Sequence, residues 1–245
     1  MPARRNRGIF TLAFAVLAWG AAAQESPTEH PFKLSVGDYL LTGGGKPADR
    51  ALDVNLRHSS DLGNLWIGWY RQREAGFSDW RSGWDHTFDT GAVRVQPSVQ
   101  LASGGFRGGS VYLETGETWF AGAGLGRTNL RPSVNLNFDP NDAVTLAAGR
   151  TWDEAGKLTL LLVADNREHP EQRHLHLNWR AGRPGHERLT LDLLAKRGDV
   201  EGQRIARLGV SATYDWPRWF MRAAWDPKVN FTPQDMLRLS AGARF

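Results

Sequence analysis

Apolar and polar residues alternate with a period of two along most of the chain after its first 23 residues. In the run from residue 51 to residue 59, Leu52 and Leu56 lie on one face, and Asp53 and Arg57 lie on the other. Successive side chains of a β-strand point to opposite faces, so this period is typical of a strand with one apolar face. The pattern predicts an all-β chain.

The same alternation recurs in short runs separated by turn residues. The clearest further runs are residues 92–102, 130–138 and 174–180. Clusters of Asp, Asn, Gly and Pro lie at residues 61–64, 139–142, 153–156, 182–185 and 197–202, and these residue types favour tight turns. A parallel connection needs a dozen or more residues, so connections this short predict antiparallel neighbours in an up-and-down meander. One domain is expected.

The number of strands follows less directly from the pattern. About 15 segments qualify as candidate strands, but a closed bacterial barrel with both ends in the periplasm has an even number. The stretches 74–81 and 104–109 are rich in Gly and polar residues and are predicted to be long loops. We therefore expect about 12 strands, with 14 as the alternative. The segment Asp226 to Asp235 is expected to fold into the pore or to form an external loop.

The first 23 residues form a separate segment. Arg4, Arg5 and Arg7 precede an apolar run from residue 8 to residue 19, and the small residues Ala21 to Ala23 follow. This order predicts a secretory signal peptide over residues 1–23, and the barrel domain then covers residues 24–245. A membrane-spanning helix is the alternative, but the run is shorter than the roughly 20 apolar residues that a bilayer requires.

The charge of the chain excludes one class of partner. Without the predicted signal peptide, 27 basic and 26 acidic side chains remain, a formal charge of +1. These charges are scattered, and no basic helix is predicted to lie along a phosphate backbone, so we expect no nucleic-acid partner. The chain has no Cys, which excludes disulfides, Cys-ligated metals and thiol nucleophiles. No cofactor is expected.

Alternation alone does not separate a soluble barrel from a membrane barrel, but charged residues in the middle of strands do. Unpaired charges in a dry interior would cost several kcal/mol each, whereas a water-filled lumen keeps them solvated. Charged residues in the middle of strands therefore favour a closed antiparallel transmembrane β-barrel with a polar lumen. The charged residues concerned are Asp53, Arg57, Arg94, Arg131, Arg180, Arg207, Arg222 and Arg238.

Aromatic residues cluster near the ends of the candidate strands, and the chain has 11 Trp. Such residues form girdles where a barrel meets the two membrane surfaces. The alternative is that they fill the core of a soluble sandwich. The clusters are Trp66, Trp69 and Tyr70; Trp80 and Trp84; Trp119 and Phe120; and Trp216, Trp219 and Phe220.

The last ten residues form an alternating strand that ends in an aromatic residue. One face carries Leu237, Leu239, Ala241, Ala243 and Phe245. This segment resembles the C-terminal signal by which the barrel assembly machinery recognises outer-membrane clients. The resemblance implies a Gram-negative outer-membrane location, with this machinery and outer-membrane lipid as partners.

Seven arginines on the polar faces are the candidate selectivity residues of the lumen. Arg side chains form bidentate hydrogen bonds with carboxylates and phosphates, so they favour anionic solutes. The alternative is that they pair with Asp53, Asp85, Glu114 and Asp192 across the lumen and only brace the barrel. The seven are Arg57, Arg94, Arg131, Arg180, Arg207, Arg222 and Arg238.

The size, the strand layout and the segment 129–134 followed by the turn at 139–142 resemble the small monomeric porins that take up acidic oligosaccharides. Those porins are 12-stranded barrels with Arg-lined lumens. The resemblance covers the domain in pattern, without a residue-by-residue motif. It implies a passive channel for small polar or anionic solutes.

A second hypothesis is an outer-membrane lipid hydrolase, acting on lipid A or phospholipid. His58 and Ser60 are two residues apart on the predicted lipid face, and a His can activate a Ser hydroxyl to cleave an ester. The His-x-Ser element is similar to one in lipid A deacylases, with Asp61 or Glu74 as candidate acids. A third hypothesis is a structural or adhesive barrel.

His174 and His176 lie on one face of a candidate strand and are candidate metal ligands. Two residues seldom form a complete site, and Arg180 lies on the same face. We therefore interpret the pair as part of a polar lumen lining and predict no metal site.

Overall fold

The structure is a computed structural model that describes residues 30–45, 47–127, 143–152, 156–165, 171–183, 186–200 and 202–245. The predicted signal peptide, Arg131, the predicted strand 130–138 and the turn at 139–142 lie outside these residues. Within the described ranges, no helix is long and apolar enough to cross a membrane.

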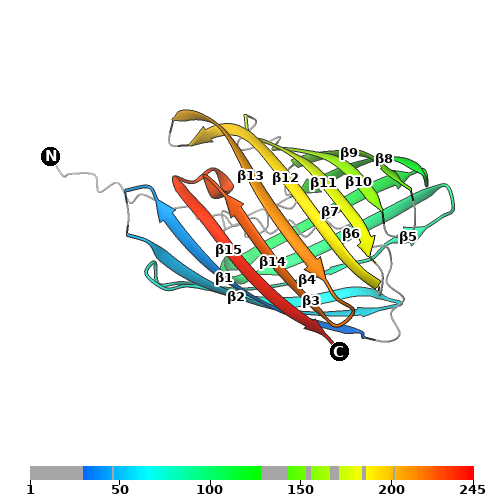
Figure 1. The fold of residues 1–245 in the computed structure, drawn as a ribbon, viewed down its shortest axis with the longest axis horizontal. Coiled ribbons are helices and arrows are strands. Elements are labelled where there is room, and N and C mark those ends of the chain that lie inside the picture. Colours follow the sequence, from blue (N-terminus) through cyan, green and yellow to red (C-terminus); the bar gives the residue numbers. More distant parts are fainter. Residues whose placement is uncertain are drawn as a thin grey trace.

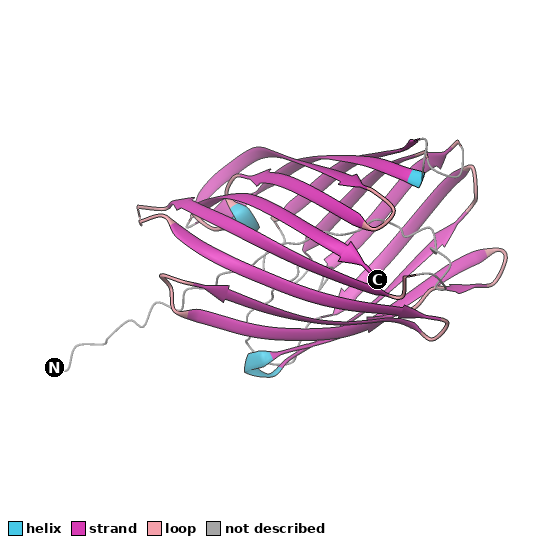
Figure 2. Cartoon of the chain, turned by 60° about the horizontal axis from the view of Figure 1, so that its bottom comes forward, coloured by secondary structure: helices cyan, strands magenta, loops and turns pink. Residues whose placement is uncertain are grey.

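The described residues form a long, curved wall of antiparallel strands (Figures 1 and 2). Two short 3-10 turns, η1 (Ser103–Gly105) and η3 (Val229–Phe231), lie between strands. The strands are β1 (Phe32–Gly43), β2 (Asp49–Ser60), β3 (Gly63–Gln72), β4 (Phe77–Asp85), β5 (Phe88–Asp89), β6 (Val93–Ala102), β7 (Phe106–Thr115), β8 (Trp119–Arg127), β9 (Ala143–Thr151), β10 (Lys157–Asp165), β11 (Arg173–Arg183), β12 (Glu187–Val200), β13 (Gln203–Asp215), β14 (Trp219–Asp226) and β15 (Gln234–Arg244).

The wall closes on itself. Each strand pairs with its neighbour in sequence, β1 also pairs with β15, and β4 pairs with β6 past the two-residue strand β5. Among the described residues, 14 strands therefore form a closed ring. The structure confirms the expected closed antiparallel barrel and the alternative strand number of 14. The first expectation, about 12 strands, is too low.

The β1–β15 pair joins the two ends of the described chain. Phe32 and Phe245 exchange two backbone hydrogen bonds of 3.0 Å, and their rings stack 5.7 Å apart. Because the number of strands is even, both residues lie at the same end of the barrel. We call this the termini end and the opposite one the far end.

The two faces of the wall differ as the alternation predicts. Outward positions carry exposed apolar side chains, such as Leu160 at 48% and Leu239 at 56% exposure. Inward positions carry buried polar and charged side chains, such as Asp53 and Arg238. Polar groups inside and an apolar band outside are the arrangement of a transmembrane barrel and the reverse of a soluble one.

Exposed aromatic residues lie near both ends of the barrel, where the girdles of a membrane barrel lie. Those at the termini end are Phe32, Phe88, Trp119, Trp152, Trp216, Trp219 and Phe245, and those toward the far end are Trp69, Trp80 and Trp225.

Four aromatic residues expected in the girdles point into the lumen instead. Tyr70, Phe120 and Phe220 are buried there, and Trp66 packs against the lumen side of Gly83. Each of these four residues is an odd number of positions away from an outward-facing aromatic residue of its cluster, and such residues point to opposite faces of a strand. Grouping by sequence position alone therefore assigned residues from both faces to one girdle.

Three predicted connections are shorter than expected. The stretch 74–81 lies mostly in β4, and 104–109 lies mostly in β7. The predicted turn 197–202 is largely strand, because β12 continues to residue 200 and β13 begins at Gln203. These strand segments carry Gly, Ser and Arg. The two faces of each strand therefore differ too little in polarity for the alternation to identify the strand.

Adjacent residues of β10 test the assignment of faces. We expect Leu160→Arg, in the middle of the outward face, to lower the free energy of unfolding by about 2–4 kcal/mol, because the charge would enter hydrocarbon. Thr159→Arg, on the lumen side, should leave it nearly unchanged. Denaturant unfolding of protein refolded into phospholipid vesicles measures both; equal losses would contradict the assignment.

Candidate functional site

The lumen wall is the most chemically distinctive surface of the molecule. Register and burial place both charge signs on it, with more cations than anions among the described residues. The inward cations are Lys33, Arg57, Arg81, Arg94, Lys157, Arg180, Arg188, Lys196, Arg207, Arg222, Arg238 and Arg244; the inward acids are Asp49, Asp53, Asp79, Asp85, Glu114, Asp192, Asp215 and Asp226.

Several of these cations pair with acids of nearby strands on the lumen face of the wall. The Arg81 guanidinium donates to both carboxylate oxygens of Asp53 at 2.8 and 2.9 Å, and the Tyr39 hydroxyl donates to the same carboxylate at 3.2 Å. Arg81 and Asp53 belong to β4 and β2, so the pair spans only one intervening strand. With both side chains less than a tenth exposed, this pair braces the wall.

Two of the predicted selectivity residues take part in similar pairs. Arg94 donates to Glu114 at 2.6 Å and to the Gly116 carbonyl at 2.9 Å. Arg57 lies 3.8 Å from Asp85, a looser contact. Both pairs join nearby strands along the wall, so they do not cross the lumen as the bracing alternative assumed.

Arg222 and Arg238 differ from these residues because their partners are hydroxyl groups. The Arg222 Nε atom donates to Thr213 Oγ1 at 2.8 Å, and the Arg238 Nε atom donates to Ser240 Oγ at 2.9 Å. Within the described residues, neither guanidinium makes an ion pair with a carboxylate. Two partly satisfied cations on adjacent strands can therefore bind an anion.

The strands around this pair hold the two side chains in place. In the register, Arg222 faces Ser240, and Arg238 faces Tyr39. The Arg238 guanidinium lies 5.2 Å from the centre of the Tyr39 ring, a cation–π distance. Gly37 completes the neighbourhood, since a Cβ atom there would lie only 3.0 Å from Ser240 Oγ. We name Arg222, Arg238, Thr213, Ser240 and Tyr39 the arginine pair site.

Aromatic rings inside the lumen hold two lysines toward the termini end. Lys33 Nζ lies 4.5 Å from the centre of the Phe220 ring, and Lys157 Nζ lies 4.0 Å from that of Phe120. Phe220 packs over Gly242, where a Cβ atom would collide with the ring. These lysines were not among the predicted lumen residues, although their inward position in the alternation was the available signal.

The other predicted selectivity residues have separate locations. Arg180 lies on the lumen face, opposite Lys157 and Thr190 on the neighbouring strands. Arg207 lies opposite Lys196, so the register places it on the lumen side of β13, where its residue is exposed toward the far end. Arg131 lies outside the described residues.

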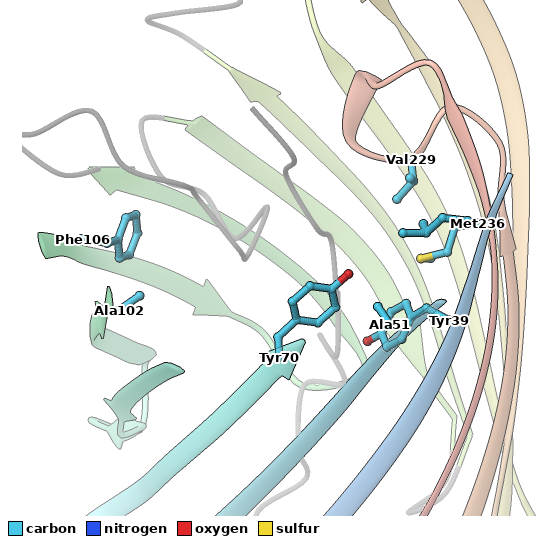
Figure 3. Close-up of a cluster of buried hydrophobic side chains, with 8 residues drawn as sticks. Tyr39, Ala51, Tyr70, Ala102, Phe106, Val229 and Met236 are labelled. Atoms are coloured by element: carbon cyan, nitrogen blue, oxygen red, sulfur yellow. The ribbon is translucent and has the colours of Figure 1, made fainter. Parts of the chain in front are cut away.

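The connection between β14 and β15 folds into the barrel. Val229 and Phe231 of η3 are buried, and Figure 3 shows Val229 beside Met236, above Tyr39 and Ala51. The sequence predicted that the segment from Asp226 to Asp235 either folds into the barrel or forms an external loop. The structure shows the first alternative, because this segment enters the lumen. It lies inside the far end of the lumen.

Specific contacts hold this inward loop. Lys196 forms an ion pair with Asp226 and donates to the Lys228 carbonyl at 3.1 Å. The Phe231 ring stacks on His174 at 5.1 Å between ring centres. Gly198 leaves room for this ring, because a Cβ atom there would collide with Phe231 Cε1.

The two candidate metal-ligating histidines have other contacts. His176 Nδ1 lies 2.9 Å from Asp192 Oδ1, and His174 stacks on Phe231. In the part of the chain that the structure describes, no group of three or more His, Cys, Asp or Glu residues is arranged to hold a metal ion.

The predicted His-x-Ser element lies near the termini end of β2. The His58 ring packs 4.8 Å from the Phe32 ring, while the Ser60 hydroxyl donates to the Gly63 carbonyl at 3.2 Å. Glu74 lies at the far end, just after β3. No hydrogen bond among the described residues joins His58 to Ser60, and the hydrolase stays a hypothesis.

The architecture is similar to that of solved outer-membrane proteins, whereas no similarity in sequence is found. No protein-family model and no curated protein sequence matches the chain. Among solved structures, the outer membrane protein Omp33 of Acinetobacter baumannii aligns with a TM-score of 0.54 and 12% identity, over 89% of this chain and 99% of that one. The two chains share one fold.

Two porins align less closely. A mutant of Rhodopseudomonas blastica porin has a TM-score of 0.49 and 9% identity, and KdgM porin has a TM-score of 0.46 and 11% identity. Both alignments cover 87% of this chain and 99% of the other. At 12% identity, the alignment with Omp33 shows a shared barrel fold and transfers no site.

The inward loop gives a test of the lumen geometry. In Gly198→Ala the new methyl group would collide with Phe231, so we expect the loop to leave its position and expose the peptide bond after Lys228. Trypsin cleavage there should rise roughly tenfold for each 1.4 kcal/mol of lost loop stability. Mass spectrometry of the fragments measures it. Gly109→Ala, where a Cβ atom meets only Ser98 O at 3.5 Å, is the control; unchanged cleavage in Gly198→Ala would contradict this packing.

Proposed function

We propose that the chain is an outer-membrane protein that forms a passive channel for small polar, mainly anionic solutes. The observation that carries the proposal is the arginine pair site, where two lumen-facing guanidinium groups have hydroxyl partners and no carboxylate partner among the described residues. The barrel fold, the apolar outer band and the charged lumen wall support it.

The arginines have two roles in this proposal. Arg222 and Arg238 offer their remaining N–H groups to a passing carboxylate or phosphate, and Arg57 and Arg180 extend the basic lining toward the termini end. Arg94 and Arg81 are held by Glu114 and Asp53 and keep the wall in shape. The predicted Arg131 belongs to the proposed lining by sequence alone.

The proposal also fixes an orientation. In bacterial barrels the termini lie in the periplasm, so the termini end faces the periplasm and the far end faces outside. The same hypothesis includes export by the predicted signal peptide and recognition of β15 and the terminal Phe245 by the barrel assembly machinery. The exposed apolar side chains of β15 and its terminal Phe245 fit such recognition.

Planar-bilayer electrophysiology tests the channel and its selectivity. In a KCl gradient, the reversal potential of the wild-type protein should indicate a preference for chloride. Arg238→Gln should lower the anion-to-cation permeability ratio by about 2- to 5-fold, because one elementary charge leaves a narrow aqueous pore.

The matched control is Arg150→Gln, which removes the same charge from the outer wall, where Arg150 lies over the Trp119 ring. This variant should keep the wild-type ratio. The proposal fails if the refolded wild-type protein conducts no ions, or if both variants change selectivity equally.

A further inference from the structure

Donor groups of three adjacent strands converge at the arginine pair site. Thr213 of β13 and Ser240 of β15 both lie directly opposite Arg222 of β14 in the strand register. Arg238 lies two positions before Ser240 on β15, and its Nε atom donates back to the Ser240 hydroxyl. The two guanidinium groups and the two hydroxyl groups therefore line one part of the lumen wall.

The hydrogen bonds within the site leave most of its donors available. Each arginine uses its Nε–H group for a hydroxyl oxygen, so the NH2 groups of both guanidinium ions can donate to another acceptor. Each hydroxyl accepts one of these bonds and keeps its own hydrogen for donation. In the part of the chain that the structure describes, no carboxylate accepts a hydrogen bond from any of these four side chains.

The carboxylates that act electrostatically on Arg222 already have other partners. They belong to Asp215 and Asp192. Asp215 accepts a hydrogen bond from another arginine of β15, and Asp192 lies 2.9 Å from a histidine of β11. The largest charge effect on Arg222 comes from Arg238, which has the same charge. A bound anion would offset this repulsion.

The site is recessed in the wall and has room beside its donors. Thr213, Ser240 and Arg238 are each less than a tenth exposed, whereas Arg222 is only half-buried. Gly37 of β1 lies opposite Ser240, and a Cβ atom there would lie 3.0 Å from Ser240 Oγ and 3.8 Å from Arg238 Nε. The absence of a side chain at this position leaves space next to two of the donors. A small anion in contact with Arg222 can therefore reach them.

Donors of this number and arrangement favour a tetrahedral oxyanion. The oxygens of a carboxylate lie in one plane, and a single guanidinium binds both of them. A terminal phosphate has acceptor oxygens that do not lie in one plane, and it carries about −1.5 to −2 charge at neutral pH. It can therefore use both guanidinium groups and both hydroxyl groups at once, and its charge matches that of two arginines.

We propose that the arginine pair site binds the terminal phosphate of a small solute, either inorganic phosphate or a phosphate monoester, more tightly than carboxylates and halides. This inference rests on the proposed channel, because the phosphate reaches the site through a water-filled lumen. It names the solute class that the channel selects.

Isothermal titration calorimetry of the detergent-purified protein with inorganic phosphate near neutral pH tests the site. Fumarate, a rigid planar dianion, should bind about 10-fold more weakly than phosphate, because it cannot meet both guanidinium groups and both hydroxyl groups at one point. Thr213→Val keeps the size and charge of the site but removes one hydroxyl. It should weaken phosphate binding by about 10-fold, the effect of losing one hydrogen bond to a charged group.

The matched control is Thr159→Val, which removes the same hydroxyl from the lumen side of β10, four strands away from Arg222. This variant should bind phosphate as the wild type does. Heat-modified gel mobility verifies that every variant is folded. Wild-type affinity for phosphate no greater than that for fumarate would overturn the proposal, as would phosphate binding by Thr213→Val equal to that of the wild type.

Two further measurements separate the sources of phosphate and the two proposals. Glycerol 3-phosphate binding with the affinity of inorganic phosphate would assign the site to monoesters, and much weaker binding would restrict it to free phosphate. Calorimetry requires no ion flow. A conducting protein without phosphate binding would therefore overturn this inference alone, whereas phosphate binding by a protein without conductance would overturn only the proposed channel.

Discussion

A peptide group surrounded by lipid has no water to bond, so each N–H and C=O in the wall must find a partner on a neighbouring strand. The β1–β15 and β4–β6 pairs meet this requirement, because they leave the ring of 14 described strands without an open edge. Closure fixes which face of every strand points inward. The burial of charge, the position of the aromatic residues and the inward loop all depend on it.

Closure of the barrel brings the charged side chains of many strands into one lumen. The role of each charged side chain then depends on the group with which it pairs. A pair such as Arg81 and Asp53 stabilises the wall but neutralises both charges. Arg222 and Arg238 have hydroxyl partners, which orient a guanidinium and leave its charge available. Selectivity is thus expected where pairing is incomplete.

The sequence predicted the faces of β2, β6 and β11 because their apolar and polar positions contrast strongly. It did not identify β4, where Ser78 and Ser82 lie among the outward positions and weaken the contrast. The partner of each arginine could not be predicted, because the Arg81–Asp53 pair depends on register across β3. The inward turn of residues 227–233 depends on Gly198 and His174 of other strands.

The most direct test of the lumen assignment uses the absence of Cys from the chain. Single Cys substitutions at Met221, Ala223 and Ala224 of β14 would be treated, in vesicle-reconstituted protein, with membrane-impermeant thiol reagents of opposite charge; Ala224 is half-buried on the lumen side, opposite Arg238, and the other two face outward. We expect Ala224→Cys to react readily and faster with the anionic reagent, while Met221→Cys and Ala223→Cys react slowly. An unreactive Ala224→Cys, or a faster reaction with the cationic reagent, would contradict a water-filled, anion-attracting lumen.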